Sequence, residues 1–495
     1  MGAAMGRWFG LALMAILFAL AGVIGWRTAQ YGQEIRAPKP LSAPGASVAI
    51  DAGLAAQHLG EAIGFATIAN PDGSPQEVAA FAGLHAWMAR VYPALHAAAP
   101  PESVAGQSLL FRWAGRDASL PPILLAAHQD VVPVEEGSAA RWRAPAFSGE
   151  QRDGAVIGRG ALDDKGSLIA ILEAAEALAK TGFTPKRTIL LAFGADEEVT
   201  GRGAQAMAAL LAQRGEKPWF ALDEGMVIVQ RHPVTSGPVA LIGIAEKGYG
   251  TLVITARAHA GHSSIPPKDL AVSRLAHALV RLEKLPIDAG LNDGPAGAML
   301  RALAPQLPFL TRALLANEWL FGPLIEAQLA RDPRALALMR TTIAPTMLSA
   351  SIKENVLPGQ AQAAINFRLH PRDSAQSILE RARALLAPIE GIELAWAAPP
   401  REASPVSAID SPAFLWLASL ASEAGEGVPA APALVLGGTD GRAYSEVAQG
   451  VYRFVPVRLS DEEIASIHGD DERLPVKELE RAVHFYARVM QEGGP

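Results

Sequence analysis

The chain has 495 residues, more than one domain usually contains, so two domains are expected. Its formal net charge is -7. No basic run with interleaved aromatic residues occurs, which argues against a nucleic-acid partner. The absence of cysteine excludes disulfides and thiolate ligands, so a metal site would have to consist of histidines and carboxylates.

The segment from Trp8 to Trp26 is uncharged and predominantly apolar, and Arg7 and Arg27 border it. As a helix it would cover about 28 Å, close to the thickness of a bilayer core. Its terminal Trp residues suit a membrane interface. We therefore predict a membrane anchor within residues 1–35, followed by a Pro- and Ala-rich linker over residues 36–47.

A cleaved signal peptide is the alternative interpretation of this segment, because Ala19-Leu20-Ala21 offers a processing site. The flanking charges do not settle the orientation of an anchor. If the N-terminus stays inside, both interpretations export the rest of the chain to the periplasmic or extracellular side.

Residues 48–247 alternate between strand and helix patterns, and chemically active residues follow the strands or glycine turns. These are His128 and Asp130 at the end of P-P-I-L-L-A-A-H-Q-D, Asp163 in G-R-G-A-L-D-D-K-G, Glu197 and Glu198 in A-F-G-A-D-E-E, and Asp223 in W-F-A-L-D. Ligands bind at the carboxyl ends of strands in open α/β sheets. Together with His468, this set predicts an α/β domain that carries a two-metal hydrolytic centre.

His128 and Asp130 are two positions apart and therefore share one face of an extended chain. A histidine that binds metal through one nitrogen needs its other N–H held, and a neighbouring carboxylate commonly does this. We expect Asp130 to orient His128 in this way.

A different order of elements begins near residue 248. We expect a strand over 250–258, a helix over Leu270–Leu285, strands over Thr346–Ile352 and Gln362–Leu369, a helix over Ala375–Leu386 and a strand over Ile392–Ala397. This order predicts a two-layer α+β domain over residues 248–400, inserted into the catalytic domain. Residues 401–495 return to the catalytic domain and end with a helix over Val476–Met490.

The segment 286–345 forms a helical insertion within the inserted domain. Its Leu, Phe, Trp and Ala residues recur at roughly helical spacing, which favours core packing. A lipophilic wall for the substrate is the alternative.

Several motifs together carry a family resemblance. They are His128-Gln129-Asp130, Gly158 to Lys165, Asp196-Glu197-Glu198, Ala258 to Ser264, Gly437-Gly438-Thr439-Asp440 and Ile467-His468-Gly469. From about residue 50 to the C-terminus, the chain resembles the co-catalytic di-zinc peptidases and aminoacylases. Its Gly-His-Ser-Ser motif, followed by a helical insertion, is most similar to carboxypeptidase S and the N-fatty-acyl-amino-acid hydrolases.

The resemblance implies a catalytic domain with a central mixed sheet and an inserted lid domain that also forms a homodimer. It implies two Zn²⁺ ions per subunit, with Co²⁺ or Mn²⁺ as alternatives. Asp163 would bridge the ions, Glu198 and His468 would complete one site, and His128 and Asp223 the other. Nitrogen and oxygen ligands of this kind suit zinc.

The same resemblance implies the remaining roles. Glu197 would act as the general base, and His262 would reach the partner subunit's site and contact the oxyanion. The positions that correspond to those for a substrate carboxylate are Arg368, Asn355, Gly438 and Thr439. Arg suits this task because its planar fork can pair both carboxylate oxygens.

We therefore predict a metallohydrolase that cleaves an amide bond next to a free carboxylate. The first substrate class is a short peptide, cut as a carboxypeptidase would cut it, and the alternative is an N-acyl amino acid. The catalytic set cannot separate these two. A metal-free binding protein on the same fold is a third hypothesis, but it should lack a ligand or the base, and none is missing from the sequence.

Overall fold

The computed structural model describes residues 2–33, 35, 41, 48–288, 290, 293–329 and 331–494, with side chains from Trp8 onward. The linker expected over residues 36–47 lies outside the described residues, except for Leu41. The chain divides into two compact units, which are described separately. Unit 1 comprises Met1–Ile35 and Ala245–Val406, and unit 2 comprises Arg36–Ile244 and Ser407–Pro495.

Unit 2 is built on a ten-stranded mixed sheet. In spatial order its strands are β1 (Glu102–Val104), β2 (Ser108–Trp113), β6 (Ile189–Gly194), β3 (Ile123–His128), β7 (Phe220–Asp223), β17 (Val451–Arg453), β9 (Val239–Glu246), β8 (Ile228–Val229) and β18 (Arg458–Leu459), and β16 (Ala430–Val435) also pairs with β9. Strands β6, β3, β7 and β17 are mutually parallel, so their carboxyl ends meet at one edge. The predicted α/β fold with a mixed sheet is confirmed.

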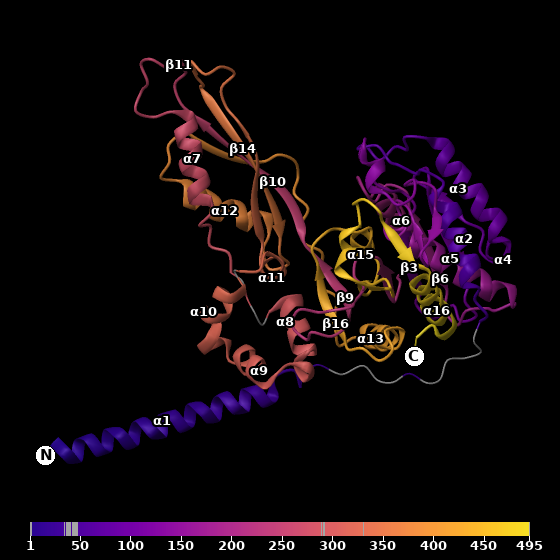
Figure 1. Ribbon diagram of the computed structural model, residues 1–495, viewed down its shortest axis with the longest axis horizontal. Coiled ribbons are helices and arrows are strands. Elements are labelled where there is room, and N and C mark those ends of the chain that lie inside the picture. Colours follow the sequence, from indigo (N-terminus) through magenta and orange to yellow (C-terminus); the bar gives the residue numbers. More distant parts are fainter. Residues whose placement is uncertain are drawn as a thin grey trace. The chain divides into compact units, whose positions relative to one another are not determined.

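Helices cover both faces of this sheet (Figure 1). On β3, Ile123 and Leu125 pack into one core, whereas Leu124 and Ala126 pack into the other, as the period of an extended strand requires. The first core contains α2 (Ala52–Ile63), α3 (Val78–Val91), α4 (Pro93–Ala98), α5 (Lys165–Lys180), α13 (Pro412–Ala424) and α16 (Val476–Glu492). The second contains α6 (Arg202–Gln213) and α14 (Gly441–Tyr444).

Smaller elements complete unit 2. They are a three-stranded sheet of β4 (Glu150–Arg152), β5 (Ala155–Ile157) and β19 (Arg473–Pro475), the short helix η1 (Ser138–Arg141), and α15 (Asp461–Ala465). Strand β19 pairs with β5, and therefore the chain after α15 lies beside the loop that precedes α5.

Unit 1 contains a four-stranded antiparallel sheet in the order β12 (Thr342–Ser349), β14 (Gln360–Leu369), β10 (Gly248–Arg257) and β15 (Ile392–Trp396). Helices α7 (Ala271–Leu282) and α12 (Ala375–Leu386) share one hydrophobic core with this sheet. Beyond the far end of β10 and β14, β11 (Gly261–His262) pairs with β13 (Val356–Leu357) and extends the same hairpin (Figure 1).

Strand β12 begins four residues before the strand expected over Thr346–Ile352 and ends at Ser349. Pro345 lies within it and pairs with Ile365, next to a register shift. Proline cannot donate to a sheet ladder, so it is tolerated on an edge strand such as β12. The sequence-based boundaries of this strand were therefore wrong at both ends.

Residues 286–341 contain several short helices before β12 begins at Thr342. They are α8 (Gly294–Ala302), η2 (Ala304–Gln306), α9 (Phe309–Ala316), α10 (Glu318–Leu329) and α11 (Pro333–Met339). The N-terminal helix α1 (Gly2–Gln30) belongs to the same unit and packs against α9. Residues Trp8–Gln30 of α1 form a candidate membrane span with a mean hydropathy of 2.3.

Candidate metal centre

The centre lies at the edge of the unit 2 sheet where the parallel strands end. His128 is the last residue of β3, Glu198 follows β6, and Asp163 comes from the loop between β5 and α5. His468 follows α15 in a left-handed backbone conformation, with φ of 59°. Two groups of potential ligands form here and share Asp163.

The carboxylate of Asp163 stands between the two histidines. Its Oδ1 is 2.8 Å from Nε2 of His128, and its Oδ2 is 3.0 Å from Nε2 of His468. Burial alone would raise the pKa of Asp163, but its hydrogen bonds with His128 and His468 outweigh burial and lower it. Each carboxylate oxygen therefore faces a different histidine, which is the arrangement that a bridging ligand needs.

Glu198 completes the group around His468. Both of its carboxylate oxygens lie 3.1 Å from Nε2 of His468. Hydrogen bonds with Asp163 and Glu198 raise the pKa of His468 to about 10.

The group around His128 contains Glu224, and the structure does not place the expected Asp223 in it. Asp223 ends β7, and its Oδ2 accepts a hydrogen bond from the backbone N–H of Gly441. Glu224, in the bend after β7, is therefore a further candidate ligand, and the role predicted for Asp223 stays a prediction. Both acids are adjacent in the sequence, but the strand pattern does not indicate which side chain points toward His128.

Asp130 orients two parts of the centre at once. Nδ1 of His128 is 2.9 Å from the backbone oxygen of Asp130 and 3.4 Å from its Oδ1. The two carboxylate oxygens of Asp130 also accept hydrogen bonds from the backbone N–H groups of Glu197 and Glu198, at 3.1 Å each. Asp130 therefore connects the end of β3 with the segment that carries both glutamates.

Glu197 belongs to neither donor group. Burial raises its pKa well above the usual value, and the nearby carboxylates of Asp440, Glu198 and Asp163 raise it further against the opposing effect of His128. The preceding acid, Asp196, has a different task, because its carboxylate accepts hydrogen bonds from the backbone N–H groups at the start of α6.

Sequence reasoning missed Glu472, which positions the Asp163 loop. Its buried carboxylate accepts hydrogen bonds from the backbone N–H groups of Gly160, Leu162 and Asp163, at 3.1, 2.8 and 3.1 Å. It also forms a buried ion pair with Arg159 at 2.7 Å. Nη2 of Arg159 donates to the backbone oxygen of His468 at 3.3 Å, so one network holds both loops that carry candidate ligands. Only its position four residues after His468 hinted at this role.

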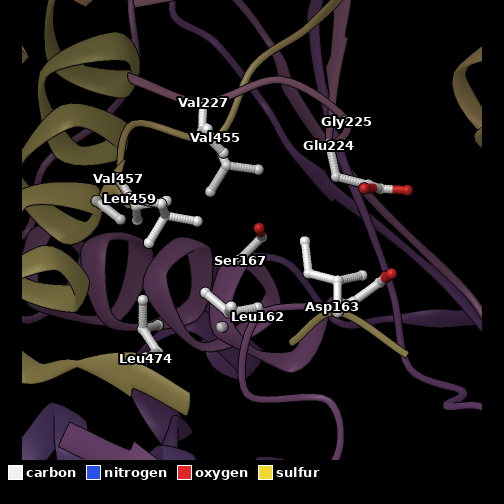
Figure 2. A pocket seen from close by; sticks show the side chains of 13 residues that line it. Leu162, Asp163, Ser167, Glu224, Gly225, Val227, Val455, Val457, Leu459 and Leu474 are labelled. Carbon is white, nitrogen blue, oxygen red and sulfur yellow. The ribbon is translucent and has the colours of Figure 1, made fainter. Parts of the chain in front are cut away.

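An apolar pocket adjoins the metal groups (Figure 2). Asp163 and Glu224 lie on one side of it, and Ser167 and mostly aliphatic side chains line the rest. These are Leu162, Val227, Val455, Val457, Leu459, Ile467 and Leu474. A substrate group that enters this pocket would meet an apolar surface.

The expected substrate-binding residues fall into separate places. His262 and Asn355 lie together at the tip of unit 1, where His262 pairs with Val356 and the N–H of Ser263 donates to the oxygen of Asn355. Arg368 lies near the opposite end of the same hairpin, stacked 4.9 Å from the ring centre of Tyr249. At about 3.3 Å per residue, roughly 35–40 Å separate Arg368 from the tip.

Gly438 and Thr439 belong to unit 2. Oγ1 of Thr439 accepts a hydrogen bond at 3.2 Å from the N–H of Gly441, the same group that donates to Asp223. These two residues therefore lie beside β7, near the metal-binding loops.

Residues 124–492 match peptidase family M20/M25/M40. The chain belongs to this family. It is 39% identical over 397 residues to human N-fatty-acyl-amino acid synthase/hydrolase PM20D1, a match that covers 79% of this chain and 78% of that protein. It is 36% identical over 442 residues to probable carboxypeptidase S-like 2 of Dictyostelium discoideum, covering 88% and 84%.

Solved structures share the fold of this M20 chain. An M20 family metallo-carboxypeptidase, Sso-CP2 from Sulfolobus solfataricus, aligns with a TM-score of 0.59 at 16% identity, over 88% of this chain and 98% of that one. The resemblance drawn from the motifs is confirmed, and the chain is a hydrolase of the metallopeptidase and amidohydrolase type. M20 enzymes use a divalent metal, and the two donor groups around Asp163 fit such a metal.

Proposed function

We propose that unit 2 binds two Zn²⁺ ions, with Co²⁺ or Mn²⁺ as alternatives, and hydrolyses an amide bond next to a free carboxylate. His128 and Glu224 would hold one ion, Glu198 and His468 the other, and Asp163 both. The position of Asp163 between two histidine-containing donor groups carries this proposal, because the ligand atoms of each group lie within 4.8 Å of one another. Bound there, the metals would polarise the amide carbonyl and acidify the attacking water.

Glu197 is the proposed general base. It lies beside the donor groups without joining them, and Asp130 fixes its backbone. Glu197 would take a proton from water as the water oxygen bonds to the carbonyl carbon. It would then deliver that proton to the amide nitrogen as the C–N bond breaks, which releases an amine and a carboxylic acid that loses its proton to solvent. A base that later acts as an acid benefits from a raised pKa, as burial provides here.

The substrates proposed are short peptides and N-acyl amino acids. The apolar pocket beside Asp163 and Glu224 favours an apolar group on the acyl side of the scissile bond. One relative is named for N-fatty-acyl amino acids and another for carboxypeptidase S, so both classes suit this branch. Arg368, Gly438, Thr439 and Asn355 are the proposed contacts for the free carboxylate.

Kinetics on the purified, zinc-loaded full chain test this proposal. The substrates are dipeptides with free or amidated C-termini, and N-acyl amino acids of rising chain length. We expect kcat/KM to fall sharply on amidation and to rise with acyl length, since each buried methylene contributes about 0.8 kcal/mol. If kcat/KM does not change with acyl length, the pocket does not bind the acyl chain and the peptidase assignment is favoured. Equal rates on amidated substrates would contradict the carboxylate requirement.

We also propose that the enzyme is a homodimer through unit 1, with His262 acting in the partner subunit. One carboxylate cannot contact both Arg368 and the distant tip of the same unit, so a site that uses both requires two chains. The edge strand β12 exposes Met347 and Leu348, which suits pairing with a second copy.

Subunit mixing tests the dimer. Inactive Glu197→Gln and His262→Ala subunits should regain activity when mixed, because half of the heterodimer's sites would combine both wild-type groups. Subunits of Glu197→Gln mixed with Glu198→Gln serve as the control, since both changes lie in the same unit. If activity does not recover although the subunits are shown to exchange, His262 does not act in the partner's site.

Finally, we propose that α1 anchors the exported enzyme in the membrane. The apolar span Trp8–Gln30 supports this, and a cleaved signal peptide is the alternative. Mass measurement of the mature N-terminus and extraction with alkaline carbonate distinguish the two. An anchored chain keeps Trp8 and stays in the pellet.

A further inference from the structure

The C-terminal half of α1 is attached to the helical insertion of unit 1. Its less exposed residues Leu20, Ile24 and Thr28 recur every four positions and therefore form one stripe on the helix. Thr28 is buried, and Nε of Arg27 donates to the backbone oxygen of Ala316, the last residue of α9, at 3.0 Å.

Asn317, between α9 and α10, strengthens the attachment. Its buried side chain lies 3.4 Å from the backbone oxygen of Ile24 and 3.4 Å from Oγ1 of Thr28. Ile24 is six residues before Gln30, which is about 9 Å along a helix axis. The junction of α9 and α10 thus contacts the last turns of the candidate span.

The same two helices expose an apolar surface, which we call the platform and define as Phe309, Leu310, Trp319 and Leu324. These side chains are 65, 70, 56 and 62% exposed. Leu300, Leu303 and Leu315 of the same insertion are buried, in agreement with the core packing expected there. Core packing does not explain the exposed side chains of the platform. All four belong to α9 and α10, the helices on either side of Asn317, and several large exposed apolar side chains on neighbouring helices are candidates for a binding surface.

We propose that the platform lies in the headgroup and upper acyl region of the bilayer that α1 crosses. This inference rests on the proposed anchoring by α1. Interfacial helices bury their apolar face about 5–10 Å deep, and Asn317 contacts Ile24 within the last two turns of the candidate span. Exposed Trp26 on α1 and Trp319 on α10 are of the type that concentrates at this level of a membrane.

The charges on α9 and α10 indicate that the platform is held by the apolar acyl region of the membrane and not by attraction to acidic lipid headgroups. Between residues 309 and 329 the charged residues are Arg312, Glu318 and Glu326. This balance gives no electrostatic attraction to acidic lipids, so apolar burial must provide the binding. Membranes of neutral phosphatidylcholine should therefore suffice.

The absence of cysteine allows single-site labelling of the full chain. Leu310→Cys and Leu324→Cys, each carrying an environment-sensitive fluorophore, would be reconstituted in phosphatidylcholine vesicles with or without lipids that carry a nitroxide high on the acyl chain. Phe18→Cys reports separately on the anchor. Glu390→Cys, at an exposed position near the tip end of β10, is the aqueous control. Hydrolysis of a soluble substrate verifies that each labelled chain is folded.

We expect the Leu310 and Leu324 probes to shift to shorter wavelength and to lose emission with nitroxide lipids, while the Glu390 probe stays unquenched. Quenching at Phe18 but not at Leu310 or Leu324 would overturn the platform and leave the anchor intact. No quenching at Phe18 would overturn the anchor and the platform together. A wavelength shift that depends on protein concentration, without lipid quenching, would assign this surface to a second copy and overturn the proposal.

Discussion

The backbone N–H of Asp163 donates a hydrogen bond at 3.1 Å to the carboxylate of Glu472, 309 residues later in the chain. The proposed bridging ligand is thus positioned by an acid that also pairs with Arg159 and lies just after His468. This network explains how the two ends of the catalytic unit form one metal centre.

Glu472→Gln should destabilise the protein and lower its metal content. The new amide group would face N–H donors, and Arg159 would remain buried without its partner, a change that costs about 3–5 kcal/mol. Thermal unfolding and metal analysis measure the effects. Arg159→Met combined with Glu472→Gln should recover much of the stability but not the metal. If the single variant keeps both properties, Glu472 does not position the loop.

Glu197→Gln should lower kcat by at least roughly 10²-fold, the usual contribution of a general base. Metal content should not change, because Glu197 belongs to neither donor group. Metal analysis alongside steady-state kinetics checks both statements. Loss of metal, or an unchanged rate, would contradict the role given to Glu197.

Asp163→Ala should lower the metal content of both sites, whereas His468→Ala should chiefly empty one. The reason is that the oxygens of Asp163 face both histidines, while His468 contacts only the Glu198 group. Metal analysis at controlled free zinc decides between them. Full occupancy in Asp163→Ala would exclude a bridging role.

Glu224→Gln and Asp223→Asn form a matched pair that tests which of the two neighbouring acids binds the metal. Glu224→Gln should empty one site, since an amide is a poorer zinc ligand than a carboxylate. Asp223→Asn should keep its metal, because the Asp223 carboxylate accepts from Gly441. The reverse pattern of metal content would restore Asp223 to the ligand set.

The buried imidazole of His370 in unit 1 provides a pH prediction away from the metals. Burial, reinforced by Arg372 and Lys247, lowers its pKa from 6.5 to about 4. Between these pH values the unfolded chain binds more protons than the folded chain, so the free energy of unfolding falls as the pH decreases from 6.5 to 4.

His370→Gln should make this pH dependence shallower in chemical denaturation, and His484→Gln, at a half-exposed position, should leave it unchanged. Equal slopes for His370→Gln and the wild type would show that His370 does not titrate in this way.

Much of the fold was accessible from local patterns. The helix expected over Ala375–Leu386 has those bounds in the structure, since its apolar positions repeat with the helical period and Ser374 caps it. The alternation of strands and helices likewise predicted the α/β sheet. His128, Asp163 and Glu198 were selected because they stand at strand ends or glycine turns, and His468 from the family resemblance; the structure brings these four together.

Local patterns were enough to assign most strands and helices and most of the candidate ligands, because periodicity and strand ends are local properties. Three features became visible only in the folded chain: Glu224 joins the group around His128, Glu472 holds the Asp163 loop, and α1 packs on α9. Each of these depends on contacts between residues far apart in the chain or on the direction of a side chain beyond a strand end. Such contacts form only when the whole sheet and its loops are assembled, so no local pattern contains them.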